Sequence, residues 1–362
     1  MGLIVSCFSK MILSLDYASA HPTIYQCLRA SFLLPCKATM AQEQAETKYM
    51  GIEQENESLT STLPTREGWW EPFFFLQGCW LSTKMTRSVM AMKPQFHPRH
   101  DDIILATHPK CGTTWLKALA FTVINRSTHP AVASYDHPLL SHNPHDLVPY
   151  LEIPFRDLHP VTELDEIPSP RLLSTHLPLS LLPSSTSTLS RVVYLCREPK
   201  DVLVSFWYHI KTVRPDILIE FDRSFEMFCE GFSYYGPVWE HYLGYWKQSK
   251  IEPEKVLFLK YDEMAAEPTK HVKMLAEFLG VPFTDEEESR GAVEEVVRLC
   301  SFQHLKSLPV NSQGVTERIG TDNSLFFRTG KVGDWANHMT VEMARKLDCM
   351  TEEKLRGSGL TF

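Results

Sequence analysis

The sequence lacks the features that define several large protein classes. It contains no uninterrupted apolar run near the roughly 20 residues that a membrane-spanning helix needs, so we expect no contact with a membrane. It has no surplus of basic residues, because 44 Asp and Glu outnumber 36 Lys and Arg and give a net charge of −8. We therefore expect no general affinity for nucleic acid, and any anion must be bound by a local site.

The cysteine pattern also excludes common metal and redox sites. The chain has nine cysteines, and no two lie closer than nine residues, so local spacing provides neither a CxxC pair nor a Cys-rich zinc cluster. Reduced thiols in a reducing compartment fit this pattern. We expect a cytoplasmic location and no bound metal.

The composition is that of an ordinary globular protein, with 362 residues of which 43% are hydrophobic and 22% charged. Residues 1–65 are interpreted as an N-terminal leader, and the polar, acidic stretch after Met40 is typical of disorder. Residues 1–39 leave open a transit peptide or acylation at Gly2 and Cys7. Residues 66–362 are predicted to form one domain.

Three segments of this domain repeat one order: a short apolar run, a polar turn and a helical pattern. This order predicts an α/β fold with a central parallel β-sheet flanked by helices. The expected strands and helices are 103–108 with 113–126, 192–196 with 200–211, and 256–259 with 269–279.

The remaining chain gives weaker signals. Thr284 and Glu287 predict a capping box before a helix that carries Val293, Val296, Val297 and Cys300 on one face. Residues 184–190 and 311–324 are rich in turn-forming residues and are predicted loops, the second long enough to be a lid.

Residues 109–115, with the sequence PKCGTTW, follow the first predicted strand and open a helix. Gly112 lets the backbone approach a ligand closely, Thr113 and Thr114 add hydroxyl donors, and Lys110 adds a charge beside the positive end of the helix dipole. The segment is a P-loop-like anion cradle, although it lacks the GxxxxGK[ST] order of nucleotide hydrolases. An ordinary capped helix with a solvated lysine is the alternative.

Two further motifs favour the interpretation of residues 109–115 as an anion-binding loop. They are YLCREPKDVLVSFWYH at 194–209, which also follows a strand, and FFRTGKVGDWANHMT at 326–340. With PKCGTTW, they resemble the cytosolic sulfotransferase family, over roughly residues 66–362, and FCEGFSYYGPVWEHYLGYW is similar to its plant branch. The resemblance implies transfer of a sulfuryl group from 3′-phosphoadenylyl sulfate (PAPS) to a hydroxyl or amine of a small molecule.

The donor has two anionic ends, and each needs its own site. Lys110 can stabilise the leaving phosphate while the amides of residues 112–115 hold the 5′-phosphate. Arg197 and Ser205 can converge on the 3′-phosphate, as the resemblance implies. The resemblance also implies donor contacts by Tyr261, Ser301, Phe302, Arg328, Thr329 and Gly330, beside the loop residues Lys110, Cys111, Gly112, Thr113, Thr114 and Trp115, of which Trp115 is expected to stack on the base.

The acceptor hydroxyl must lose a proton, and histidine is the fitting base at neutral pH. Fifteen histidines compete for this role. His176, in the sequence STHLP, matches the catalytic histidine of the family that the sequence resembles. His108 and His209 are its rivals, and His108 is expected to pack or to line the pocket entrance.

The sequence departs from the family pattern at three places. Cys111 replaces a serine of the loop, and a thiol at a helix N-terminus is expected to be acidic and reactive. Thr329 replaces a lysine, which should weaken PAPS binding. The family's dimer motif has lost both charged ends, at Ala336 and Arg345, so we expect a monomer.

A dense set of aromatic residues is expected to supply the core and some walls of an apolar acceptor pocket. It comprises Trp69, Trp70, Phe73, Phe74, Phe75 and Trp80, with Phe155, Trp207, Tyr208, Tyr234 and Tyr235 later in the chain. A flavonoid, another phenol, a steroid or a hydroxylated hormone would fit such walls. Two other functions stay open: a nucleotide-dependent kinase, and a protein that binds PAPS or adenosine bisphosphate without turnover.

Overall fold

A computed structural model describes residues 62–131, 136–153 and 164–362. The predicted leader up to residue 61, with Gly2 and Cys7, lies outside the described residues, and so does Phe155. The described chain begins just before strand β1 (Thr65–Glu67), whose first residue was assigned to the leader.

The central feature is a four-stranded parallel sheet in the order β5-β4-β6-β7. Its strands are β4 (Ile103–Thr107), β5 (Leu172–Thr175), β6 (Arg191–Cys196) and β7 (Val256–Lys260). The chain leaves β4 for β5 on one side and then returns to β6 on the other, which makes a topological switch point beside β4. The parallel α/β fold expected from the sequence is confirmed.

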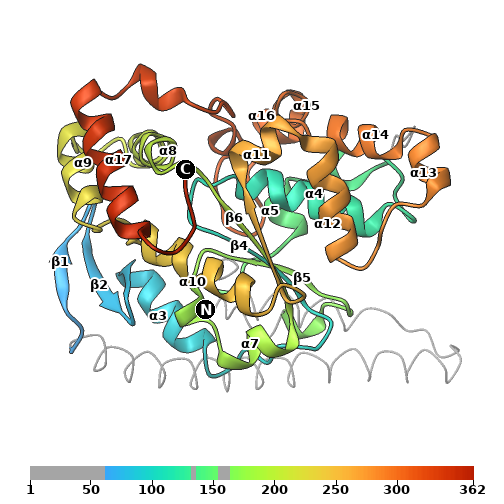
Figure 1. Cartoon of the computed structure of the whole chain (residues 1–362), viewed down its shortest axis with the longest axis horizontal. Helices are drawn as coiled ribbons and strands as arrows, with labels where there is room; N and C mark the ends of the chain where they lie inside the picture. The colour runs from blue at the N-terminus through green and yellow to red at the C-terminus, as the bar shows by residue number, and fades with distance from the viewer. Residues whose placement is uncertain (1–61, 132–135, 154–163) are drawn as a thin grey trace, which may run out of the picture. The chain divides into compact units, whose positions relative to one another are not determined.

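The sheet is buried on both faces because its side chains alternate between two hydrophobic clusters. Ile104 and Tyr194 belong to the cluster with α8 (Pro199–Val213) and α10 (Val238–Ile251). Leu105 and Val193 belong to the cluster with α4 (Thr113–Asn125), α12 (Pro268–Phe278) and α14 (Ala292–Leu299). Figure 1 shows α4 and α12 on one side of the strands and α10 on the other.

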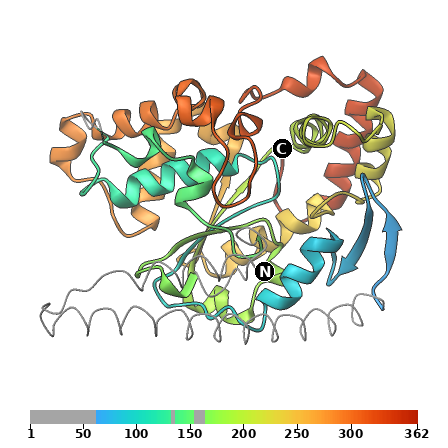
Figure 2. The ribbon, with the colours of Figure 1, turned by 180° about the vertical axis from the view of Figure 1, so that it is seen from behind.

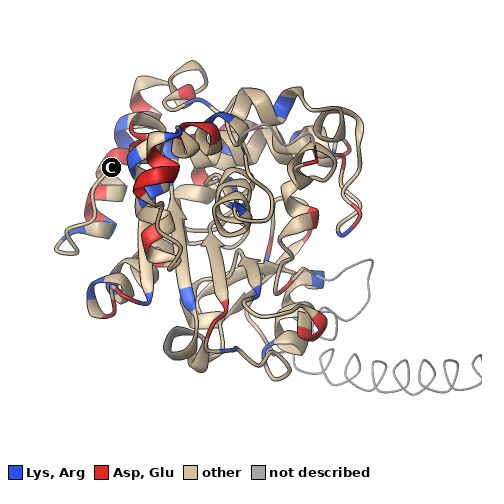
Figure 3. Ribbon diagram, turned by 90° about the vertical axis from the view of Figure 1, so that its right-hand side faces the viewer, with Lys and Arg blue, Asp and Glu red and all other residues tan. Residues whose placement is uncertain are grey.

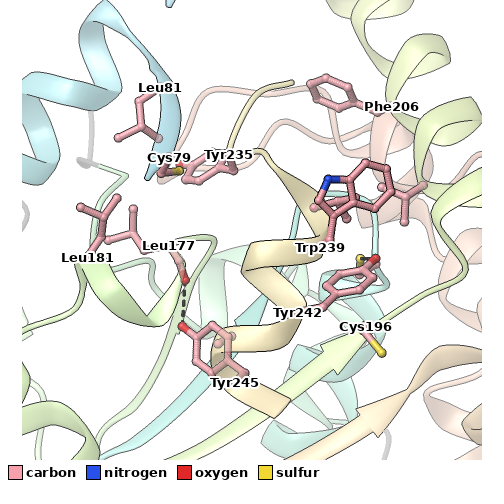
Figure 4. Close-up of a cluster of buried hydrophobic side chains, with 14 of the residues drawn as sticks. Cys79, Leu81, Leu177, Leu181, Cys196, Phe206, Tyr235, Trp239, Tyr242 and Tyr245 are labelled. Atoms are coloured by element: carbon pink, nitrogen blue, oxygen red, sulfur yellow. Dashed lines mark hydrogen bonds between the residues drawn. The ribbon is translucent and has the colours of Figure 1, made fainter. Parts of the chain in front are cut away.

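Helix α10 brings aromatic residues against this sheet (Figure 4). The Tyr245 ring stacks on Tyr194 of β6 with 4.2 Å between centroids, and its hydroxyl donates to the Leu177 carbonyl at 2.8 Å. Leu177 directly follows His176, so the packing of α10 also fixes the chain at the predicted catalytic histidine.

A second, antiparallel sheet precedes the parallel one. It consists of β1, β2 (Pro72–Leu76) and β3 (Cys79–Ser82), followed by helix α3 (Thr83–Met92). The aromatic run of residues 73–75 lies in β2. The sequence pattern predicted core and pocket residues here, but no strand. Backbone hydrogen bonds of Trp80 with Tyr235 and Gly236 tie β3 to the loop before α10.

The other helices surround this core, and α17 lies beside α9 and α8 (Figures 1 and 2). They are α5 (Pro144–Leu147), α7 (Ser184–Leu189), α9 (Phe221–Cys229), α11 (Tyr261–Ala266), α13 (Asp285–Ser289), α15 (Phe302–Ser307), α16 (Pro309–Gln313), α17 (Val341–Leu355) and the 3-10 helices Pro138–Leu140, Leu179–Leu181, Asn323–Phe326 and Asp334–Asn337.

One local prediction was wrong and two others were confirmed only in part. Residues 184–190 contain helix α7 in place of a loop, because packing of the buried Thr186 overrides the turn preference of serine and threonine. The capping box of Thr284 and Glu287 forms but opens only α13, since Gly291 with φ of 75° separates it from α14. The segment 311–324 holds the end of α16 and the start of a 3-10 helix beside its loop.

Charged residues of both signs lie mainly on the helices and loops around the strands (Figure 3). No helix within the described ranges is both long and apolar enough to cross a membrane.

Candidate functional site

The carboxyl ends of all four parallel strands deliver predicted site residues to one place. His176 follows β5, Lys110 follows β4, Arg197 follows β6 and Tyr261 follows β7. In open α/β sheets, ligands bind outside these strand ends at a switch point. A cavity of about 650 Å³ occupies this position.

The cavity collects the predicted donor-site residues with one exception, Cys111. Its walls include Lys110, Gly112, Thr113, Thr114, Trp115, His176, Arg197, Ser205, Tyr261, Ser301, Phe302, Arg328, Thr329 and Gly330. The three motifs, which lie far apart in the sequence, therefore meet at one cavity.

The loop after β4 has the backbone of an anion cradle. Lys110 adopts a φ of 72°, which is uncommon for a residue with a side chain, and Gly112 adopts 104°. A Cβ at Gly112 would lie 2.7 Å from the Tyr261 ring, so only glycine fits there. Helix α4 begins at Thr113, and the first amides of a helix have no partner within it. These amides can bind an anion at the cavity wall.

Two arginines form a second cationic region. Arg197 donates from Nη2 to Asp201 at 3.1 Å and to the Lys331 carbonyl at 2.6 Å, and Arg328 donates from Nη1 to Asp334 at 2.6 Å. The Nε atoms of both arginines are buried without a hydrogen-bond partner among the described residues. Buried donors without partners are rare in folded proteins, so this pair indicates a place for an anionic ligand.

Asp201 holds the third motif against the second. Its carboxylate accepts from the amides of Gly333 and Trp335 at 2.9 and 3.0 Å, in addition to Arg197. The Tyr261 hydroxyl donates to the Gly330 carbonyl at 3.1 Å. Asp201 itself lies in the first turn of α8.

Lys110 lies in an electrostatically unfavourable place. Burial, followed by repulsion from Arg328 and Arg197, lowers the pKa of Lys110 from 10.5 to about 8. No ion pair with another described residue offsets these effects. A polyanionic ligand would relieve the repulsion among the three cations.

His176 is held with one nitrogen facing a tyrosine. Its Nδ1 lies 2.9 Å from the Thr107 carbonyl, which can only accept, so Nδ1 carries the proton and Nε2 has the free electron pair. The Tyr150 hydroxyl lies 3.1 Å from Nε2 and can donate to it. Burial lowers the pKa of His176 to about 3, so the imidazole is neutral at physiological pH.

The backbone of His176 is fixed from both sides. Its amide donates to Glu152 Oε1 at 2.7 Å, and its carbonyl accepts from His241 Nε2 at 2.8 Å. Glu152 also accepts from the Thr175 hydroxyl at 2.9 Å, and burial raises the pKa of this carboxyl to about 7.

The two rival histidines differ in position. His108 is buried, and its ring packs on His241 with 5.3 Å between centroids, as the expectation of a packing role allows. His209 lines the cavity, and its Nδ1 is buried without a partner in the described chain. His209 is therefore the proper comparison for His176 in mutational tests.

Cys111 corrects two expectations. Its thiol is fully buried and lies 3.3 Å from the Tyr242 hydroxyl, while its amide donates to the His108 carbonyl at 3.2 Å. The thiol and the amide of Cys111 therefore both have partners within the protein, and neither is free to bind the sulfuryl donor. Burial raises the pKa of Cys111 to about 12, so the prediction of an acidic thiol was wrong: desolvation outweighs the helix terminus.

Native alkylation tests this placement of Cys111. Brief treatment with iodoacetamide followed by peptide mapping should label Cys349, the exposed cysteine of the described residues, and leave Cys111 unmodified. Added nucleotide should change neither result. Rapid labelling of Cys111 that nucleotide prevents would show that its thiol faces the cavity.

The sequence interpretation missed several residues around His176. Tyr150, His145 and Lys117 join His176 to the loop through short contacts, and Glu152 anchors its backbone. One signal was available, because Lys117 interrupts the apolar face of an otherwise hydrophobic helix. The other contacts depend on segments that only the fold brings together.

The end of the cavity beside His176 has mainly apolar walls. Trp70, Tyr234 and Tyr235 of the predicted aromatic set line it, with Ile153, Phe206 and Ile210. Trp69 and Phe73 instead belong to the core, and Phe75 packs on Trp80. The aromatic set thus divides between core and cavity.

The fold and the site define an α/β protein with a cationic cavity beside a histidine. Residues 100–359 match the family profile "Sulfotransferase domain". Cytosolic sulfotransferase 5 of Arabidopsis thaliana is 44% identical over 319 residues, which cover 86% of this chain and 97% of that protein. The chain belongs to the cytosolic sulfotransferase family and is a sulfotransferase, so the kinase alternative is set aside.

Solved structures agree with the fold. A sulphotransferase from Arabidopsis thaliana, 36% identical, covers 84% of this chain and 94% of its own, with a TM-score of 0.67. A mouse sulfotransferase crystallised with PAP, 28% identical, covers 79% of this chain and 95% of its own, with a TM-score of 0.61. PAP is adenosine 3′,5′-bisphosphate, the product that PAPS leaves after sulfuryl transfer.

Proposed function

We propose that this enzyme transfers the sulfuryl group of PAPS to a hydroxyl of a small apolar acceptor, with His176 as the base and Lys110 on the leaving phosphate. One observation carries the proposal. A single cavity holds an anion cradle with three cations at one end and a neutral, oriented histidine with apolar walls at the other.

The two ends of the donor match the two cationic regions. The first amides of α4 and Lys110 would hold the 5′-phosphosulfate, while Arg197 and Ser205 would hold the 3′-phosphate. Arg328 and Gly330 would close over the same phosphate, with Thr329 between them. Tyr261, Ser301, Phe302 and Trp115 would form the walls of the nucleoside site.

The transfer requires three events. The acceptor oxygen attacks sulfur as its proton moves to Nε2 of His176, and the bond between sulfur and the bridging oxygen breaks. Lys110 stabilises the negative charge that develops on that oxygen, which becomes part of the 5′-phosphate of PAP. The acceptor hydroxyl would replace the Tyr150 hydroxyl as the donor to Nε2, because this nitrogen has a single lone pair.

A screen of acceptors tests the proposed function. Purified enzyme is incubated with labelled PAPS and a flavonoid, a simple phenol, a sterol or a hydroxy acid, and both labelled product and PAP are measured. We expect PAP to form only when an acceptor is present. Binding of PAP without turnover on any acceptor would favour the non-catalytic alternative.

Thr329→Lys should tighten donor binding. Thr329 lines the cavity between Arg328 and Gly330, and a lysine there can reach the proposed 3′-phosphate site. A charge-assisted hydrogen bond contributes about 1.5–3 kcal/mol, so we expect the PAPS dissociation constant to fall about tenfold or more. Isothermal titration with PAP, with Thr329→Met as the uncharged control, measures the effect. An unchanged constant would dismiss the contact.

The pH profile should report Lys110. A lysine with pKa about 8 is charged below that pH and neutral above it, so kcat/KM for PAPS should hold to about pH 8 and then fall towards tenfold per pH unit. Lys110→Arg keeps its charge over this range and should lack the fall. A wild-type profile that stays flat to pH 9.5 would contradict the assignment.

We further propose that the enzyme is a monomer. Ala336 and Arg345 stand where the family's dimer motif carries its charged ends, and both positions are described, in a 3-10 helix and in α17. Light scattering during gel filtration measures the mass of the particle and decides this point.

The relatives carry the name cytosolic sulfotransferase, which agrees with the cytoplasmic location expected from the sequence.

A further inference from the structure

Lys117 is a buried lysine one helical turn after the anion-binding loop. Its Nζ lies 3.1 Å from His145 Nδ1, 2.9 Å from the Val148 carbonyl oxygen and 3.5 Å from the centroid of the Tyr150 ring. These three neighbours suit an ammonium, which has three donors and no acceptor and is attracted to an aromatic face. Burial opposes them and lowers the pKa of Lys117 well below its usual value. Lys117 is not part of the cavity wall and cannot touch a substrate.

One branch from Lys117 leads to the donor end of the cavity. If His145 Nδ1 accepts from Lys117, then the proton is on Nε2, which donates to the Thr114 hydroxyl oxygen at 2.9 Å. The Thr114 hydroxyl hydrogen is then free to point elsewhere. Because Thr114 lines the cavity beside the loop, this hydrogen can be donated to the sulfated phosphate.

The other branch leads to the base. Lys117 lies against the face of Tyr150, and the His145 ring stacks on the same tyrosine with 5.7 Å between centroids and 15° between planes. The Tyr150 hydroxyl meets Nε2 of His176 at 3.1 Å. The same buried ammonium therefore supports residues at both ends of the reaction.

We propose that Lys117 and His145 are positioning residues that direct the Thr114 hydroxyl to the donor and hold Tyr150 against His176. This inference rests on the proposed function. A purely structural role predicts that a substitution costs stability but leaves the donor affinity and turnover of the folded protein unchanged.

Lys117→Met separates positioning from stability. We expect a somewhat lower melting temperature, because the Val148 carbonyl and His145 Nδ1 lose their donor, a PAP dissociation constant about five- to tenfold higher, and kcat at least about tenfold lower. Thr122→Val is the matched control, because Thr122 is a buried residue of the same helix whose hydroxyl faces Cys300 Sγ at 3.4 Å. That control should keep wild-type PAP binding and kcat.

A double-mutant comparison tests the route through His145. Thr114→Val should weaken PAP binding in the wild type but add little in the Lys117→Met background. His145→Gln keeps a donor for Thr114 and should therefore bind PAP more tightly than His145→Leu. The comparison of these two variants tests the inference even if Lys117→Met does not fold. Wild-type PAP affinity and kcat in Lys117→Met, equal Thr114→Val effects in both backgrounds, or equal affinities of the two His145 variants would overturn the inference. Failure of the wild type to bind PAP or to transfer sulfate would instead count against the proposed function.

Discussion

His176→Ala should lose about 10²- to 10⁴-fold in kcat and keep its affinity for PAP, because the side chain removes the acceptor proton and does not hold the donor. Nε2 is the only ring nitrogen free to accept that proton, since Nδ1 faces the Thr107 carbonyl. Steady-state assays with the best acceptor from the screen measure kcat, and isothermal titration measures PAP binding.

His209→Ala is the matched control for this experiment. Its ring lines the same cavity, so both variants remove an imidazole from the same surroundings. We expect the His209 variant to keep most of its turnover. A His176 variant with a near-normal rate, or an equal loss in both variants, would remove His176 from the role of base.

Lys110→Met should lower kcat about 10²- to 10³-fold, the loss typical when one group that stabilises a developing oxyanion is removed. Burial and repulsion from Arg328 and Arg197 destabilise the Lys110 ammonium when no donor is bound. The negative charge of PAPS would stabilise it. Single-turnover rates with labelled PAPS isolate the chemical step from product release.

Lys110→Arg is the conservative control. Arginine keeps the charge but carries it on a planar guanidinium group, so we expect part of the wild-type kcat to return. The loss in kcat should exceed the loss in PAP affinity, because the ammonium acts most strongly on the leaving oxygen as charge develops. Turnover within threefold of wild type in Lys110→Met would contradict this role.

The sequence predicted the parts of the site that depend on local pattern. A short apolar run followed by a glycine-containing turn and a helix identifies β4, the loop at Lys110 and α4, because strand, turn and helix have distinct local signals. The same holds for β6 and α8 around Arg197. The sulfotransferase family and the parallel α/β fold are confirmed by the comparisons.

Side-chain direction could not be predicted in the same way. Cys111 sits in the right loop, yet its thiol packs against Tyr242, 131 residues later, and the surrounding core decides its pKa. Tyr150 meets His176 because residue 150 pairs with Ser174 of β5, and Lys117 meets His145 because α4 packs on α5. The roles of the site residues and the division at residue 65 stay predictions.

A crystal structure of this enzyme with PAP would show whether one cavity binds both phosphates. We expect one nucleotide in the cavity, its 5′-phosphate on Lys110 and the first amides of α4 and its 3′-phosphate on Arg197 and Ser205, with His176 Nε2 facing the vacant sulfuryl position. A nucleotide bound outside the cavity, or one whose phosphates contact neither Lys110 nor Arg197, would contradict it.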